Sequence, residues 1–162
     1  MPNAHRFALS ALLVMGSAVL AGLAITLSTP RYAGARIPPA GDLPWPATIT
    51  AAERELPFAL LYVDSHCAHC SRAAVIVDSV ATARGLRAII VSADSPGDGE
   101  AYRRRLRLGH AVASDTASAM IHAIGTRAVP MLVLFHRDGS RQLVVGFTSD
   151  GRYRHTLAEF AR

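Results

Sequence analysis

Cys67-Ala68-His69-Cys70 contains the only two cysteines of the 162-residue chain. An apolar run at residues 58–63 precedes these four residues, and a helical pattern over residues 71–84 follows them. A CxxC pair between a strand and a helix places the first thiol at a helix N-terminus, where unpaired N–H groups and the helix dipole favour the thiolate. The stretch therefore predicts a thiol–disulfide exchange centre.

Composition limits what can hold the fold together. Two cysteines so close in sequence cannot cross-link distant segments, so the domain has to rely on a hydrophobic core, for which about 115 residues are sufficient. All 17 basic residues are arginine, and the formal net charge is +5. The run Arg103-Arg104-Arg105 with Arg107 would spread over more than one face of a helix, without interleaved aromatic residues. We therefore expect a solvated face, or attraction to anionic lipid headgroups, and no nucleic-acid partner.

Residues 7–27 form a run of 21 residues without a charged side chain. At about 1.5 Å per residue such a helix spans a hydrocarbon core of ~30 Å, which predicts one N-terminal transmembrane helix within residues 1–28. The small residues at 21–24 leave a cleaved signal segment as the alternative. Because a CxxC redox domain is most useful outside the cytoplasm, we expect a single-pass protein of the cell membrane with its domain on the extracytoplasmic, periplasmic side.

Residues 29–47 are predicted to form a linker, because their prolines and glycines resist both helix and sheet. Trp45, the only tryptophan, is expected to pack on the edge of the domain. The remaining residues, 48–162, form the predicted domain.

The patterns along residues 48–162 alternate between strands and helices. Expected strands are 58–63, 87–92, 110–113, 131–135 and 142–147; expected helices are 48–55, 67–84, 101–108, 115–124 and 150–162. Gly85, Gly109 and Gly125 are expected to end three of the helices. Parallel pairing follows from the early strand–helix–strand units, and Asp138-Gly139 predicts an antiparallel hairpin. The fold class is therefore α/β, with a mixed central sheet flanked by helices.

This element order, with the CxxC early and Ala128-Val129-Pro130 just before a strand, resembles that of the thioredoxin superfamily. The helix and short strand between Val91 and Ser114 are similar to the insertion of the TlpA/ResA group, which are membrane-anchored, extracytoplasmic thioredoxin-like proteins. Local runs are similar to that group too: Val91-Ser-Ala-Asp94, Ser114-Asp-Thr116, Ile124-Gly-Thr-Arg-Ala-Val-Pro130, and Asp138-Gly139 followed by Val145-Gly146. The resemblance covers about residues 48–162 and implies a thioredoxin-like fold.

The resemblance also implies roles. Cys67 is expected to be the attacking nucleophile, Cys70 the resolving thiol, and Pro130 a cis-proline facing the disulfide. Val129 is expected to bond the backbone of an incoming peptide. No cofactor is implied beyond the redox-active disulfide Cys67–Cys70. The implied partners are client proteins with cysteine pairs and a redox partner protein, and relatives serve apocytochrome c maturation, copper-site assembly or general disulfide control.

The chain departs from the family pattern around the cysteines. His66 stands where thioredoxins have tryptophan, and the positions of the usual buried acids hold Leu61 and Ala73. The group that takes the proton from Cys70 is therefore open between Asp64, His66 and His69. The Ala-His dipeptide is similar to the Pro-His of DsbA-type oxidants. We expect His69 to stabilise the Cys67 thiolate and to raise the reduction potential above that of thioredoxin, about −270 mV; the alternative is an ordinary exposed helix residue.

Two other classes of function remain open from the sequence. Copper(I) held by the two thiolates, as in a metallochaperone, is the main alternative, whereas a zinc site would need a second CxxC or a distant pair of histidines. The second class is a binding module whose CxxC is incidental. His110, His122, His136 and His155 receive no role, and no resident metal is expected.

Overall fold

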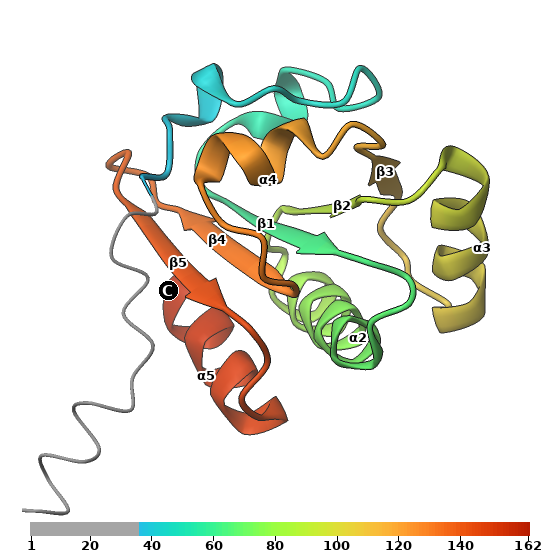
Figure 1. Ribbon diagram of the computed structural model, residues 1–162. Coiled ribbons are helices and arrows are strands. Elements are labelled where there is room, and N and C mark those ends of the chain that lie inside the picture. Colours follow the sequence, from blue (N-terminus) through green and yellow to red (C-terminus); the bar gives the residue numbers. More distant parts are fainter. Residues whose placement is uncertain (1–35) are drawn as a thin grey trace, which may run out of the picture. The chain divides into compact units, whose positions relative to one another are not determined.

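The computed structural model describes residues 36–162 (Figure 1). The expected transmembrane helix within residues 1–28 and the first part of the expected linker lie outside these residues. Within residues 36–162, none of the helices combines the length and the apolar character needed to cross a bilayer.

Five strands form one mixed sheet in the order β3-β2-β1-β4-β5 (Figure 1). β1, β2 and β3 are parallel, whereas β4 pairs antiparallel with β1 and with β5. The predicted α/β class and mixed pairing are therefore confirmed. The strands are β1 (Phe58–Val63), β2 (Ala88–Ser92), β3 (Val112–Ser114), β4 (Met131–Phe135) and β5 (Arg141–Val145).

The central strand β1 is buried over its whole length and separates two apolar layers. Ala59, Leu61 and Val63 pack on the face covered by the helices α2 (Ala68–Arg84) and α5 (Asp150–Phe160). The alternate residues of β1 pack on the opposite face, against α4 (Ala119–Ile124) and the segment that precedes β1. This alternation is the expected result for a strand whose successive side chains point to opposite faces.

Residues 36–57 contribute to that second layer. Leu43 is buried, and Trp45 stacks edge-on against Phe58 with ring centroids 5.8 Å apart, which confirms the expected packing of the tryptophan. The helix expected over residues 48–55 is only a 3₁₀ turn, Ala52–Arg54, although the Thr50–Glu53 capping box forms as the sequence predicts. A second 3₁₀ turn spans Ala40–Asp42.

The bounds of α3 and α4 differ most from the prediction. α3 spans Pro96–Leu106, because the Ser95 side chain caps it and Pro96 fits its first turn, so the predicted start at residue 101 is wrong. It ends at Arg107, which takes the left-handed conformation (φ 55°) instead of Gly109. α4 begins only at residue 119, because Asp115 reaches its first N–H groups from three residues before the N-cap.

The Asp115 carboxylate joins α4 to the central strand. It is 7 % exposed and accepts hydrogen bonds from the backbone N–H groups of Ala119 and Met120 at 3.0 and 2.9 Å. It also accepts one from the hydroxyl of Tyr62 on β1 at 3.1 Å.

Asp115→Ala is expected to lower the free energy of unfolding by about 3 kcal/mol, because it leaves buried donors without an acceptor. Urea unfolding of the full chain measures this value. Asp138→Ala is the matched control: its exposed carboxylate accepts from the backbone N–H of Ser140 at 2.8 Å, and its loss is expected to cost less than ~1 kcal/mol. Equal losses for the two variants would contradict the assigned role of Asp115.

Candidate active site

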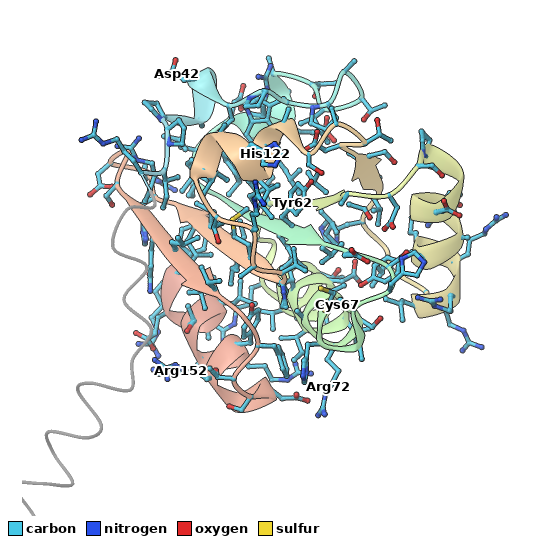
Figure 2. The ribbon with its side chains drawn as sticks, viewed as in Figure 1. Asp42, Tyr62, Cys67, Arg72, His122 and Arg152 are labelled. Carbon is cyan, nitrogen blue, oxygen red and sulfur yellow. The ribbon has the colours of Figure 1, made fainter. Side chains whose placement is uncertain are left out.

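Cys67 is the N-cap of α2, directly after the loop that leaves the central strand (Figure 2). Its sulfur accepts a hydrogen bond from the backbone N–H of Cys70 at 3.3 Å. Cys67 is partly exposed, whereas Cys70 is completely buried, and both are free thiols. The helix start thus presents one accessible sulfur where N–H groups and the helix dipole stabilise negative charge.

Cys70 lies in the apolar layer beneath the helix start, in one cluster with Tyr102 and Tyr153. Burial, and then hydrogen bonding to Cys67, raises the pKa of the Cys70 thiol well above its ordinary value. Cys70 therefore stays protonated at neutral pH, and it needs a base nearby before it can react as a thiolate.

The Val129–Pro130 peptide is cis, the isomer that the resemblance implies. Met131 pairs with Tyr62 near the end of β1, so Pro130 lies at the same end of the sheet as the loop leading to Cys67. The Pro130 carbonyl accepts from the N–H of Gly146 at 2.8 Å. Within residues 36–162, no hydrogen bond uses the backbone N–H or C=O of Val129, so both groups remain available to an added strand.

His69 is exposed and stacks on Phe147, with ring centroids 6.0 Å apart and planes at 19°. The Arg72 guanidinium lies 5.8 Å from the Phe147 ring centroid and pairs with Asp150 at 2.9 Å. These side chains border a surface hollow of about 510 Å³ between the first turns of α2 and α5. Sequence reasoning missed Phe147 as a site residue and placed it inside a strand, which in fact ends at Val145.

His66 is the residue directly before Cys67, and its imidazole is exposed. Its Nδ1 lies 3.3 Å from the Asp64 carboxylate and 3.7 Å from that of Asp94. Asp94, which follows β2, also accepts from the backbone N–H and the hydroxyl of Ser65, both at 2.9 Å. Asp94 therefore fixes the loop between β1 and the first cysteine. It was not predicted as a site residue, because the two loops are about 30 positions apart in sequence.

Asp64, His66 and Asp94 are also the group of three potential metal ligands in the described part of the chain, with ligand atoms within 4.8 Å of one another. The group contains neither cysteine sulfur. The Asp94 carboxylate already accepts hydrogen bonds from Ser65 and Ser92. These bonds are consistent with its role in holding the loop before Cys67 in place.

Asp94→Asn is expected to lower the free energy of unfolding by about 1–2 kcal/mol at pH 7. Burial alone would raise the pKa of Asp94, but the hydrogen bonds from Ser92 and Ser65 lower it on balance below its ordinary value of 3.8. A lowered pKa stabilises the fold fully above the ordinary value, and that contribution is lost as the pH falls through the folded-state value. Urea unfolding should therefore show the two proteins converging below about pH 3.8; a constant difference down to pH 2 would contradict this.

No protein-family model matches the chain, and no curated protein sequence matches it at a significant level. Several solved structures are similar to the structure of this chain. A thiol:disulfide interchange protein DsbE from Chlorobium tepidum, described as putative, matches with a TM-score of 0.59 at 18% identity, over 68% of this chain and 84% of that one. A secreted Mycobacterium tuberculosis disulfide oxidoreductase homologous to Escherichia coli DsbE matches with a TM-score of 0.56 at 17% identity, over 64% and 81%.

The chain has a thioredoxin-like fold. The exposed lipoprotein thioredoxin Etrx1 of Streptococcus pneumoniae shares it as well, with a TM-score of 0.54 at 19% identity over 65% of this chain and 85% of that one. The thioredoxin-like fold expected from the CxxC, the Val-Pro dipeptide and the hairpin is thus confirmed. Both cysteines and Val129-Pro130 lie at one end of its sheet, with His66 and His69 beside them.

Proposed function

We propose that the chain is a protein thiol–disulfide oxidoreductase that exchanges disulfides with client proteins through Cys67 and Cys70. The observation that carries the proposal is the asymmetry of the pair: an accessible sulfur at a helix N-terminus with a buried thiol one turn behind it. An exposed nucleophile and a protected resolving thiol are what a two-step exchange requires.

In the reducing direction, the Cys67 thiolate attacks one sulfur of a client disulfide. A mixed disulfide forms, and the other client sulfur leaves as a thiolate that takes a proton. Cys70 then loses its proton and attacks the Cys67 sulfur. The Cys67–Cys70 disulfide forms, and the first client sulfur leaves as a thiol. Oxidation of a client runs through the same steps in reverse, and a redox partner protein resets the pair.

Asp64 is the best placed proton acceptor for Cys70 in this scheme. The usual acid positions hold Leu61, which is buried in β1, and Ala73, which is buried in α2. Burial and the hydrogen bond with Cys67 are the main causes of the raised pKa of Cys70, and the charge of the Asp64 carboxylate adds a smaller contribution. The carboxylate is 40% exposed, so water can carry the proton onward.

The client peptide is proposed to lie across the Val129–Pro130 loop. Its backbone would pair with the N–H and C=O of Val129, as an added strand pairs with a sheet edge. On either side of the accessible sulfur, His66 and the His69–Phe147 stack would contact client side chains.

The location is proposed to be the extracytoplasmic side of the cell membrane, with residues 1–28 as a single-pass anchor. The uncharged run over residues 7–27 supports the anchor. Two proteins of the same fold are described as secreted and as an exposed lipoprotein, which supports the side of the membrane.

His69→Ala is expected to lower the reduction potential by roughly 15–30 mV, because a histidine beside the nucleophile stabilises the thiolate and so the reduced form. Equilibration with glutathione buffers, followed by alkylation and mass spectrometry, measures the potential. The wild-type value is expected above about −270 mV. His155→Ala on α5 is the control. A wild-type value at or below that figure, or no response to His69→Ala, would contradict the role of His69.

The alternative function is a copper(I) metallochaperone, in which the Cys67 and Cys70 thiolates alone would hold the ion. Titration of the reduced chain with copper(I) separates the two functions. Tight one-to-one binding without thiol exchange would favour the metallochaperone.

A further inference from the structure

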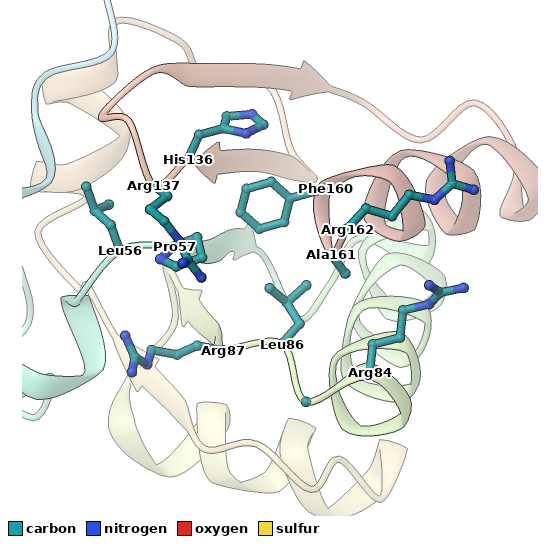
Figure 3. Close-up of a pocket in the computed structure, with 11 residues that line it drawn as sticks. Leu56, Pro57, Arg84, Leu86, Arg87, His136, Arg137, Phe160, Ala161 and Arg162 are labelled. Atoms are coloured by element: carbon teal, nitrogen blue, oxygen red, sulfur yellow. The ribbon is translucent and has the colours of Figure 1, made fainter.

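A hollow of about 640 Å³ lies at the end of the sheet opposite the cysteines (Figure 3). β1 runs from this hollow, beginning after Pro57, toward the loop that leads to Cys67. The walls come from the C-terminal ends of α2, β4 and α5 and the residues that follow them.

The centre of the hollow is apolar. Phe160 and Leu86 lie in the middle of the ring of side chains, and Leu56 and Pro57 form one side (Figure 3). Phe160 contacts the His136 ring edge-on, with centroids 4.8 Å apart. Leu56 is 39% exposed, which is unusual among the large apolar side chains described here.

The rim of the hollow is positively charged. Arg84, Arg87, Arg137 and Arg162 line it, and no lining residue is acidic. Arg87 reaches the Glu55 carboxylate at 3.8 Å, and Arg162 pairs with Glu159 at 3.0 Å. In the described part of the chain, Arg84 and Arg137 have no ion-pair partner.

Three arginine side chains of the run on α3 already have partners within the protein. Arg103 pairs with Glu100 at 2.8 Å, and Arg104 lies 3.8 Å from the same carboxylate. Arg105 covers the Tyr102 ring and donates to the Ser65 carbonyl at 3.3 Å. The hollow is therefore a better candidate for binding an anion than the arginine run on α3, although the run is the more conspicuous cluster of arginines in the sequence.

We propose that this hollow docks on anionic phospholipid at the membrane surface. Headgroup phosphates would pair with Arg84 and with Arg137, which lie on opposite sides of the hollow (Figure 3), and the apolar part of the lipid would contact Phe160 and Leu86. Charge complementarity supports this occupant, because clustered arginines attract anionic lipid and the apolar floor excludes a purely polar anion.

The course of the chain selects lipid over a soluble partner. This step rests on the proposed anchor. The Ile37 carbonyl accepts from Arg141 at 3.1 Å, so the described chain begins beside the β4–β5 hairpin, which also carries His136 and Arg137. Residues 28–35 can extend at most about 28 Å. A tether of that length would leave the hollow within reach of a bilayer that holds the proposed anchor.

Hydrogen–deuterium exchange on the full chain in lipid nanodiscs tests the proposal. Discs of phosphatidylcholine alone are compared with discs that also contain phosphatidylglycerol. Exchange is expected to slow at residues 84–87 and 136–141 only with phosphatidylglycerol. Arg84→Gln/Arg137→Gln should lower the ratio of docked to undocked domain roughly 25-fold, at about fivefold per arginine, and abolish the slowing. Arg107→Gln/Arg152→Gln removes equal charge from exposed positions elsewhere and should retain it.

Three results would overturn the proposal: no dependence on phosphatidylglycerol, equal loss in both double variants, or the same slowing with glycerol 3-phosphate added in solution. The last would indicate a soluble-anion site. Failure of the chain to associate with phosphatidylcholine discs would instead count against the anchor, and association with phosphatidylglycerol discs would still report on the hollow. Exchange of disulfides with clients is measured separately and does not depend on either result.

Discussion

Cys67→Ser is expected to lower the rate of disulfide exchange with a protein disulfide by at least about a thousandfold, to the uncatalysed level. The partly exposed Cys67 is the thiol that a client can reach, since Cys70 is completely buried. A serine hydroxyl is not ionised at neutral pH and cannot form the mixed disulfide. Reduction of insulin by the chain, with dithiothreitol as the electron source, measures the rate.

Cys70→Ser is the matched control for this loss. It should retain the first step, formation of a mixed disulfide in a single turnover, while Cys67→Ser should lose it. Urea unfolding is measured for both variants, because replacing the completely buried Cys70 thiol by a hydroxyl is expected to cost more stability than replacing the partly exposed Cys67 thiol. A rate of disulfide exchange by Cys67→Ser equal to that of the wild type would contradict the assignment of Cys67 as the nucleophile. Unchanged function of this variant in cells would indicate a binding module whose cysteines are incidental.

The second large effect is expected for Cys70→Ser itself. Without the resolving thiol, the mixed disulfide on Cys67 has no internal route to release, so its lifetime should increase by at least about a hundredfold. The substitution is nearly isosteric, and it removes a thiol whose burial keeps it protonated until the resolving step. Covalent complexes should accumulate on Cys67 in cells.

Mass spectrometry of these trapped complexes identifies the clients. The double variant Cys67→Ser/Cys70→Ser is the control and should trap nothing. Recovery of no partner by Cys70→Ser, under both oxidising and reducing conditions, would count against exchange catalysis.

The parts of the fold that the sequence predicts well depend on local signals. A continuous apolar run fixes β1, the Gly85 C-cap with φ 63° ends α2, and Asp138-Gly139 forms the turn between β4 and β5. The start of α3 was misplaced because its cap, Ser95-Pro96, lies in a loop-like stretch without apolar periodicity.

Residues that act across the fold could not be predicted in the same way. Asp94 clamps the loop before Cys67 from the end of β2, and Phe147 reaches His69 from the end of β5. Asp115 binds Tyr62 over a separation of 53 positions. Each of these contacts depends on which strands become neighbours, and no spacing in the sequence records that. The two cysteines, by contrast, are separated by only two residues, and the start of the helix that holds them is predicted from the sequence around them.

Transfer of a disulfide from the oxidised chain to a reduced two-cysteine peptide is the most direct test of exchange catalysis. Rapid mixing, acid quenching and mass spectrometry measure the amount of each product over time. The proposed function predicts one peptide disulfide formed for each Cys67–Cys70 disulfide reduced, through a transient mixed disulfide on Cys67, at a rate well above that of oxidised glutathione at the same concentration. A rate no greater than that of glutathione, or a mixed disulfide on Cys70 instead, would contradict the proposed function.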